Sequence, residues 1–192
     1  MSYIRSFVAI DLPQEVKNKL GKYQETLKNL DFDVHWENPP NFHLSLIFLG
    51  EVRPPSIDNL AKSLQDEIFM SPFTIQPSHL DYLYKRHGDS ILFIALTGET
   101  NKLRELYDQV CVSVEHSLKL STTYRFLPHI TLGRVKPYLD QQQKKTILYK
   151  LINHQPSIFP KLTVSAVKIM QTDFQQDAAH QYASISTISL SS

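Results

Sequence analysis

Three segments rich in β-branched and aromatic residues follow one another in the middle of this chain, with only short polar breaks between them. They span residues 73–77, 79–84 and 90–97, and residues 85–89 form the turn before the third segment. These breaks are too short for a helix, whereas parallel neighbours need a crossover of a dozen or more residues. The pattern therefore favours an α+β fold with antiparallel strands over a doubly wound parallel sheet.

The rest of the chain alternates between helical and strand-like patterns. Helical spacing of apolar residues predicts helices over residues 13–30, from Pro54 to Ile68 and over 101–119, and the Gln- and Lys-rich residues 140–151 are predicted as a weak helix. Further strands are predicted over residues 3–10, 34–36, 43–49, 126–135, 161–171 and 182–190. A strand, a helix and more strands occur before residue 97 and again after it. We therefore expect one domain, residues 1–192, built from two pseudo-symmetric lobes of antiparallel sheet backed by helices.

Composition narrows the classes of function. Hydrophobic residues make up 42% of the 192 residues and charged residues 20%, which is typical of a soluble globular protein with a real core. The net charge of +1 provides no broad field for a long polyanion, so any contact with nucleic acid is expected to be local. The single cysteine, Cys111, excludes an internal disulfide and a cysteine-based zinc site, and it suits a reducing cytosol.

The start of the chain shows no targeting signal of the secretory type. Its apolar run ends at Ile10, which is too short for a signal peptide, and no run reaches the 18 or so apolar residues of a membrane span. We therefore expect a cytoplasmic protein with no membrane contact.

Two short segments of the chain repeat each other. Residues 42–46 read Phe-His-Leu-Ser-Leu, and residues 128–132 read Pro-His-Ile-Thr-Leu. Either copy alone is a weak signal, because a histidine followed by a hydroxyl residue is common and a strand histidine usually serves packing. Two copies, each in a predicted strand and at a corresponding place in its half, are much harder to attribute to chance.

The alternation of strand side chains gives this repeat a chemical meaning. It directs His43 and Ser45 to one face of their strand, and His129 and Thr131 to one face of theirs, while the intervening residues enter the core. If the two lobes face each other, the cleft between them holds two imidazoles and two hydroxyl groups. One neutral imidazole can then remove a proton from an attacking oxygen while the other, protonated, gives one to a leaving oxygen at phosphorus. An ordinary pKa near 6.5 makes both protonation states accessible.

At these segments the sequence resembles the two-histidine (2H) phosphoesterase superfamily, whose hallmark is a pair of His-x-Ser/Thr-apolar motifs. Its closer likeness is to the LigT-like branch, the RNA 2′,3′-cyclic phosphodiesterases, also known as 2′-5′ RNA ligases. The resemblance covers nearly the whole chain and includes residues 5–13, residues 36–51 with Phe-Leu-Gly-Glu at 48–51, and, most specifically, residues 125–134. It implies a bilobal fold around a central cleft, hydrolysis without a metal, and a product with a 2′-phosphate.

The resemblance also assigns roles to residues. His43 and His129 match the catalytic pair, and Ser45 and Thr131 match the hydroxyls that bind phosphate. Serine stands at position 45 where threonine is commoner; it keeps the donor but lacks the methyl group that restricts the rotamer. Arg134 matches a position that contacts the ligand phosphate, although simple alternation places it opposite His129 unless the strand twists or bulges.

Three further residues are candidates for contacts with the base or the RNA. Phe48 matches an aromatic position of the family, yet alternation directs it away from His43, and we interpret it as a core residue first. Trp36 can line a base pocket or pack in the core, and Arg125 shares the face of His129 but also fits a solvated strand start. Aromatic faces stack on bases without sequence preference.

The resulting hypothesis is a metal-independent phosphodiesterase that opens 2′,3′-cyclic phosphates at RNA ends or on nucleotides. We expect His43 to be the proton donor and His129 the proton acceptor, although the sequence alone does not fix this order. We expect no cofactor and no metal site, because the sequence has no nucleotide-binding glycine motif and neither motif has metal-ligand spacing. We also expect a monomer. The alternatives are a 2′-5′ oligonucleotide phosphodiesterase or ligase, and a binding module for RNA ends without turnover.

Overall fold

The computed structural model describes residues 3–122, 126–136, 138–173 and 181–191. These residues form nine strands, four α-helices and one short 3₁₀ helix. The strands are β1 (Ile4–Asp11), β2 (Val34–Trp36), β3 (His43–Val52), β4 (Phe73–Leu83), β5 (Ser90–Gly98), β6 (His129–Val135), β7 (Leu162–Val164), β8 (Ala166–Asp173) and β9 (Gln181–Ser189). The helices are α1 (Gln14–Lys28), η1 (Pro39–Asn41), α2 (Pro54–Glu67), α3 (Thr100–Leu118) and α4 (Gln141–Ile152). No helix in this described part has both the length and the apolar character needed to cross a bilayer.

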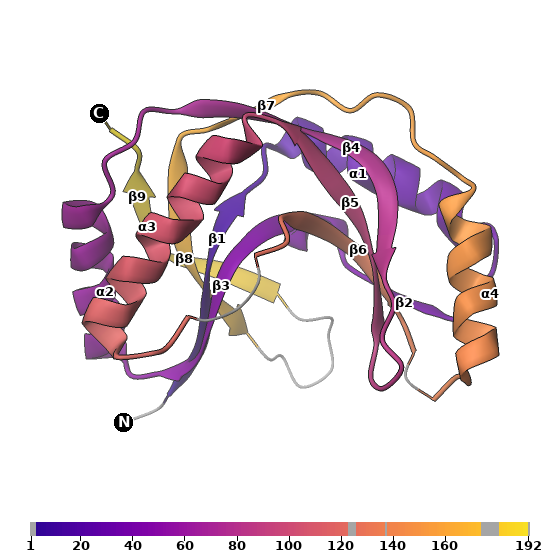
Figure 1. Ribbon diagram of the computed structural model, residues 1–192, viewed down its shortest axis with the longest axis horizontal. Helices are drawn as coiled ribbons and strands as arrows, with labels where there is room; N and C mark the ends of the chain where they lie inside the picture. Colours follow the sequence, from indigo (N-terminus) through magenta and orange to yellow (C-terminus); the bar gives the residue numbers. More distant parts are fainter. Residues whose placement is uncertain (1–2, 123–125, 137, 174–180, 192) are drawn as a thin grey trace.

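All described strands belong to one sheet, and all the pairings between them are antiparallel. The strand order is β7-β4-β5-β6-β3-β1-β8-β9, and β2 adds to β6. Figure 1 shows that the sheet bends into an arch with the helices on its outer side. We call β1, β3, β8 and β9 the first lobe, and β2, β4, β5, β6 and β7 the second lobe. The predicted α+β class with an antiparallel sheet is confirmed.

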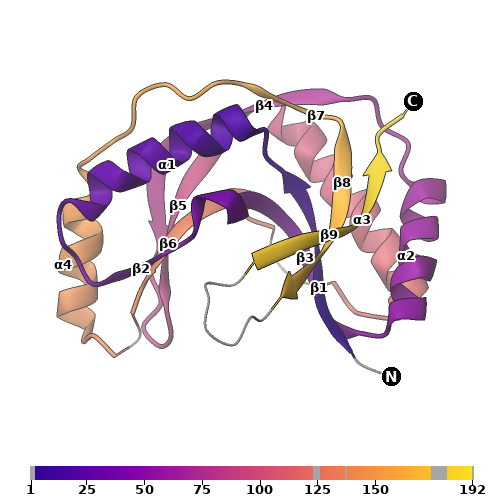
Figure 2. The same cartoon turned by 180° about the vertical axis from the view of Figure 1, so that it is seen from behind.

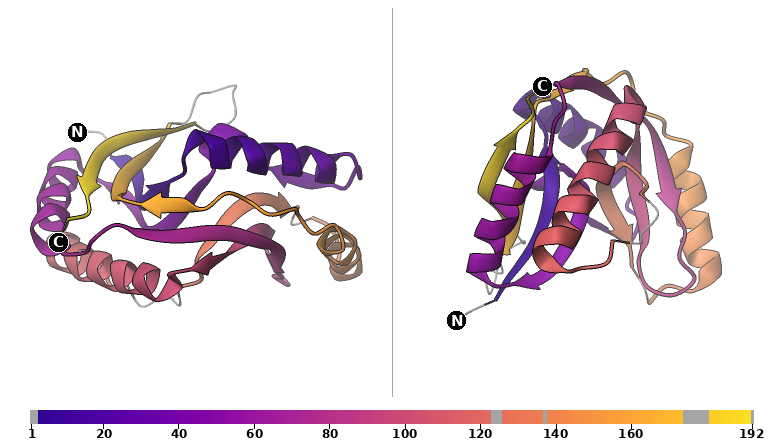
Figure 3. Two further views of the ribbon diagram at one scale, coloured as in Figure 1. Left: turned by 90° about the horizontal axis from the view of Figure 1, so that it is seen from above. Right: turned by 60° about the vertical axis from the view of Figure 1, so that its left-hand side comes forward.

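The sequence pattern suggested that each lobe is one half of the chain, but the lobes do not coincide with the two halves. Helix α1 follows β1 of the first lobe but covers the second, and α3 follows β5 of the second lobe but packs beside α2 and β3 of the first. Figure 2 shows α1 across the second lobe, and Figure 3 shows α2 and α3 side by side. This exchange of helices connects the lobes, because α1 follows a strand of the first lobe and packs on the second, and α3 follows a strand of the second lobe and packs on the first.

The outer face of the arch carries the main hydrophobic core. The buried positions of α1 include Val16, Leu20 and Leu27, which recur at helical spacing and face the sheet. Leu44 and Ile130, at the centre of the arch, are completely buried in the same cluster. The inner face keeps a small apolar group of its own, Phe7, Ala9 and Met170, against which Tyr182 packs.

Two predicted strand boundaries were wrong. The continuous strand predicted over residues 161–171 is two strands, β7 and β8, which lie in different lobes and pair with β4 and β1. Conversely, the two strands predicted over 73–77 and 79–84 are one strand, β4, whose register to β5 shifts between Pro77 and Leu80. The predicted break was a bulge, which interrupts the pairing without ending the strand.

A bulge in β6 determines which side chains share its inner face. Phe93 of β5 pairs with Thr131, but Leu92 pairs with Gly133, so β6 carries one extra residue between them. Both Leu132 and Gly133 are buried as a result, and the alternation resumes one residue later. A Cβ atom on Gly133 would lie 2.8 Å from Val34 Cγ1 and 3.1 Å from the carbonyl oxygen of His35, so β2 can pair here only beside a glycine.

We therefore predict that Gly133→Ala destabilises the protein by about 1–3 kcal/mol, the usual cost of overpacking a filled site. The comparison variant is Thr163→Ala on the exposed side of β7, which should change stability by less than about 0.5 kcal/mol. Urea unfolding measures both free energies. Equal stability of Gly133→Ala and the unmodified protein would contradict the close packing of β2 on β6.

Candidate active site

The two motif strands meet at one pair of residues in the centre of the arch. Leu44 of β3 is the partner of Ile130 of β6 in an antiparallel register, and no other aligned pair joins these strands among the described residues. Both side chains point to the core, so the residues on either side of them point to the inner face. The register then places His43 on the side of Thr131, and Ser45 on the side of His129. The pairing brings together all four predicted motif residues.

His43 is held by hydrogen bonds at both ring nitrogens. Its Nδ1 lies 2.7 Å from the carbonyl oxygen of Asn41, and its Nε2 lies 2.8 Å from Ser45 Oγ. Because a carbonyl only accepts, Nδ1 carries the proton, and Nε2 is the nitrogen available for proton transfer. Phe7 and Tyr182 flank the ring, with centroids 4.9 and 5.1 Å from it.

His129 is held in the same way on the other strand. Its Nδ1 lies 2.7 Å from the carbonyl oxygen of Leu127, again two residues earlier in the chain, so its Nε2 is likewise the nitrogen available for proton transfer. Phe93 of β5 packs beside the ring at a centroid distance of 5.2 Å. The residue preceding Leu127, Phe126, stacks on Tyr107 of α3 at 4.1 Å, which fixes the segment that supplies this carbonyl group.

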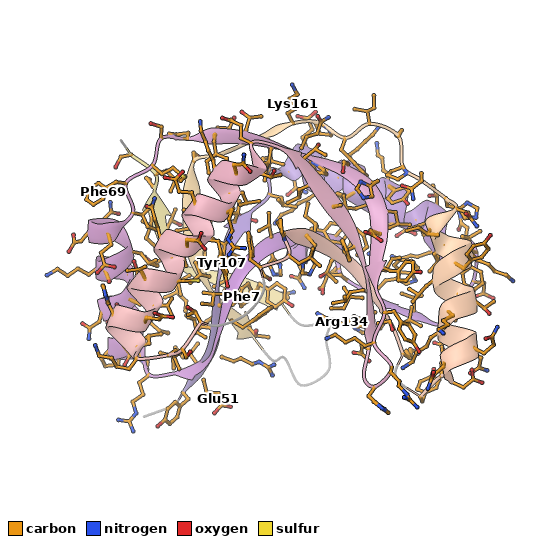
Figure 4. The ribbon with its side chains drawn as sticks, viewed as in Figure 1. Phe7, Glu51, Phe69, Tyr107, Arg134 and Lys161 are labelled. Atoms are coloured by element: carbon orange, nitrogen blue, oxygen red, sulfur yellow. The ribbon has the colours of Figure 1, made fainter. Side chains whose placement is uncertain are left out.

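Bulges bring two more predicted residues to this face. On β6, the bulge at residues 132–133 turns Arg134 to the side of His129, which the sequence analysis required for a phosphate contact. On β3, Val8 pairs with Ile47 but Ala9 pairs with Ser45, and this equivalent bulge turns Phe48 to the side of His43. Figure 4 shows both Arg134 and Phe7 on the inner side of the arch. Phe7 is the cross-strand partner of Phe48.

The interpretation of Phe48 as a core residue was therefore wrong. Its side chain is 72% exposed, and its ring lies 5.9 Å from that of Phe7. Simple alternation failed because it does not count the extra residue of the bulge. An exposed aromatic ring on the histidine face fits the predicted base contact.

A buried glutamine connects the surroundings of the two histidines. Gln24 of α1 is completely buried, and its Nε2 donates to the carbonyl oxygens of Glu37 (2.7 Å) and Leu132 (2.9 Å). Leu132 belongs to the bulge that orients Arg134. Glu37 lies before η1, and its carboxylate accepts a hydrogen bond from the amide of Asn41, the residue whose carbonyl group holds His43. One side chain thus positions segments that lead to both imidazoles.

An ion cluster anchors the other side of His43. Asp11 is the cross-strand partner of His43, and its carboxylate lies 2.8 Å from Lys17 Nζ and 2.7 Å from Lys168 Nζ. Lys17 also donates to the carbonyl oxygen of Pro40 at 2.8 Å. Although burial raises the pKa of Asp11, the hydrogen bonds from the two lysines hold it below its usual range. The cluster therefore fastens the η1 segment to β1 beside the histidine.

The environment lowers the pKa of both imidazoles below the ordinary value of 6.5, chiefly because burial disfavours the charged ring. For His43, the bond to the Asn41 carbonyl and the charges of Glu37 and Asp11 oppose this lowering of the pKa, while Lys17 adds to it. For His129, the Leu127 carbonyl opposes it and the charge of Arg134 adds to it. The ordinary pKa assumed from the sequence therefore does not hold here, and the two rings have different electrostatic neighbours.

Trp36 and Arg125 are the two remaining predicted contacts with the base or the RNA. Trp36 is half-buried, packs against the main core and pairs with Gly133, so its role as a base contact stays a prediction. Arg125 lies outside the described residues. No role for Phe7, Phe93, Tyr182 or Gln24 follows from the sequence, because only the strand register and the exchange of helices bring these residues to the site. The described residues contain no group of three or more histidine, cysteine or acidic side chains arranged to hold a metal ion.

Comparison with known proteins agrees with this geometry. Residues 10–89 match the family described as LigT like Phosphoesterase. The chain is 32% identical over 142 residues to an RNA 2′,3′-cyclic phosphodiesterase of Thermotoga maritima, covering 73% of this chain and 75% of that protein. The chain belongs to the LigT-like phosphoesterase family. A second member, the RNA 2′,3′-cyclic phosphodiesterase of Methanocaldococcus jannaschii, is 26% identical over 73% of this chain and 76% of its own length.

Solved structures show that the fold is that of this family as well. The structure of Escherichia coli LigT in its apo form superimposes on this chain with a TM-score of 0.78 at 18% identity, and the match covers 100% of both chains. The structure of E. coli LigT complexed with 3′-AMP also gives a TM-score of 0.78, at 19% identity and 99% coverage of both chains. The predicted 2H phosphoesterase family is confirmed.

We predict that both imidazoles titrate below pH 6.5 in the ligand-free protein, as Nδ1–H tautomers, and that inorganic phosphate raises both pKa values. The folded state binds these two protons more weakly than the unfolded chain does. Their contribution to stability is therefore complete above about pH 6.5 and is lost as the pH falls. Nitrogen-15 NMR of the histidine rings measures the tautomer and the midpoint. A midpoint at or above 6.5 for either ring would contradict the role given to burial.

A second prediction concerns Gln24. Gln24→Met keeps the shape but removes both donors, so it should cost about 1–3 kcal/mol of stability and weaken the binding of inorganic phosphate several-fold. The same change made in an Arg134→Ala background should weaken phosphate binding much less, because Gln24 acts on phosphate through the bulge that orients Arg134. Calorimetric or NMR titration gives the four affinities, and independent effects of the two changes would rule out this route.

Proposed function

We propose that this protein hydrolyses 2′,3′-cyclic phosphates at RNA ends or on nucleotides to 2′-phosphomonoesters, without a metal ion. The observation that carries the proposal is the matched presentation of two imidazoles on one face. Each has its Nδ1 proton engaged by a backbone carbonyl, so proton transfer falls to Nε2, which in His43 is hydrogen-bonded to Ser45 Oγ. The names of the relatives, RNA 2′,3′-cyclic phosphodiesterases, support this substrate class.

In the proposed reaction, water attacks phosphorus opposite the 3′-oxygen. The neutral Nε2 of His129 removes the proton of the water, and the protonated Nε2 of His43 gives its proton to the departing 3′-oxygen. The P–O3′ bond breaks and a new P–O bond forms, which leaves the phosphate on the 2′-oxygen. Ser45, Thr131 and Arg134 provide donors for the non-bridging oxygens, where negative charge is held. Phe48 provides an exposed ring for the base.

The charges around the two rings support this order of roles. Glu37 and Asp11 act on His43 in the direction that favours its protonated form, and Lys17 opposes them, whereas the one charge that acts on His129, Arg134, favours its neutral form. Of two equivalent imidazoles, the one near carboxylates more readily carries a proton to give, and the one near a guanidinium is more readily neutral and able to take one. In the proposed reaction the departing 3′-oxygen replaces Ser45 Oγ as the partner of His43 Nε2 and then takes the Nε2 proton.

The experiment is incubation with the four nucleoside 2′,3′-cyclic phosphates and a short RNA that ends in one, with excess EDTA throughout. We expect turnover with EDTA present and a 2′-phosphate product, identified by phosphorus-31 NMR. A requirement for added zinc or manganese would contradict the metal-free mechanism. A 3′-phosphate product would contradict the assigned bond, and 2′-5′ linked oligonucleotides as the sole substrates, or binding without turnover, would favour the alternatives.

Variants of the same assay test the histidine roles. His43→Ala and His129→Ala should each lower kcat by roughly 10²- to 10⁴-fold, and the double variant should lose much less than the product of the two losses. Ser45→Ala and Thr131→Ala should each cost less than either histidine, since they leave both proton transfers in place. The control is His79→Ala, on an exposed position of β4, which should keep its activity. Full activity in His129→Ala would contradict the paired-motif mechanism.

A further inference from the structure

Tyr182 occupies a place at the site that the mechanism above does not use. It is the second residue of β9, which begins beneath the arch near its centre (Figure 1). Its ring meets the rings of Phe7 and His43 nearly at right angles, with centroids 5.1 Å away in both cases. These two contacts fix the direction of the phenol ring next to the imidazole proposed as the proton donor.

The hydroxyl group of Tyr182 is not used by the part of the chain that the structure describes. The side chain is half-buried, yet its oxygen is not enclosed, and it has no hydrogen-bond partner within the described residues. A tyrosine that is held by ring contacts usually directs its O–H to a partner. No group of the described residues takes this part, so the hydroxyl is available to solvent or to a bound ligand.

The surroundings of this hydroxyl suit an anionic ligand. Burial raises the pKa of Tyr182, so the group remains a proton-bearing donor across the neutral range. The charged groups that act on it are Glu37, Arg134 and Arg5, which come from the loop after β2, from β6 and from β1. Charged residues of both lobes therefore act electrostatically on the hydroxyl.

We infer that Tyr182 donates a hydrogen bond from its hydroxyl to a non-bridging oxygen of the phosphate bound between His43 and His129. It acts beside Ser45 and Thr131 as a third hydroxyl donor, contributed by the C-terminal strand rather than by a motif strand. This inference rests on the proposed function for the place of the phosphate. Its ligand is the phosphate group itself, not the base.

The test compares Tyr182→Phe, which removes only the hydroxyl, with Tyr182→Leu, which also removes the ring. Tyr149→Phe is the matched control, because Tyr149 is a 68% exposed tyrosine on α4, away from the histidine face. Two quantities are measured for each protein: kcat/KM with adenosine 2′,3′-cyclic phosphate, and the dissociation constant of inorganic phosphate from NMR titration. Thermal unfolding and the histidine ring signals report on folding.

We expect Tyr182→Phe to lower kcat/KM by roughly 10- to 100-fold, the range for a hydrogen bond to a charged group, and to weaken phosphate binding in the same direction. Tyr149→Phe should change neither quantity. If Tyr182→Phe keeps both values within twofold while Tyr182→Leu loses them, the ring serves only to pack His43, and the inference is overturned. A loss confined to the nucleotide, with phosphate affinity intact, also overturns it. If the unmodified protein shows no turnover, the proposed function fails, and the phosphate affinities still decide the role of Tyr182.

Discussion

The structure depends on one cross-strand pair, Leu44 with Ile130, where the two lobes of the sheet meet. Both side chains are fully buried in the main core, and this pair is the single register point that the described parts of β3 and β6 share. Since neighbouring strand residues face opposite sides, burying this pair forces the histidines and hydroxyls next to it onto the inner face. The apolar residue inside each motif is thus as necessary to the site as the histidine beside it.

From this pair outward, the sequence predicts the site only as far as the strands stay regular. In each motif the histidine and the hydroxyl residue are only two positions apart, so simple alternation is enough to place His43 with Ser45 and His129 with Thr131 on one face. Phe48 and Arg134 lie five residues after their histidines, and each is preceded by a bulge that reverses the alternation. A bulge is defined by the residue that the partner strand lacks, so the sequence of one strand does not reveal it. This is why Phe48 was interpreted as core, and why Arg134 depended on an unseen irregularity.

The same limit applies to the fold. The existence and approximate bounds of the four helices follow from local apolar spacing, and the antiparallel sheet follows from strands without helices between them. The division of residues 161–171 into β7 and β8 does not follow, because the two strands are separated by one residue, Ser165, and differ in their partners rather than in their pattern. Gln24 is hidden for a related reason: its acceptor on β6 is 108 residues away in the chain.

The near two-fold arrangement of the site also poses a chemical problem, because proton transfer in both directions requires two imidazoles that differ. Each motif supplies a histidine and a hydroxyl two residues later, and in both a carbonyl group two residues earlier holds Nδ1, so the motifs provide two similar groups. The difference in their charged surroundings comes from residues outside the motifs. Asp11 and Glu37 lie on the side of His43, while the bulge brings Arg134 to the side of His129. Since a bulge and a neighbouring strand create this asymmetry, the assignment of acid and base depends on tertiary structure, even though the identity of the two histidines does not.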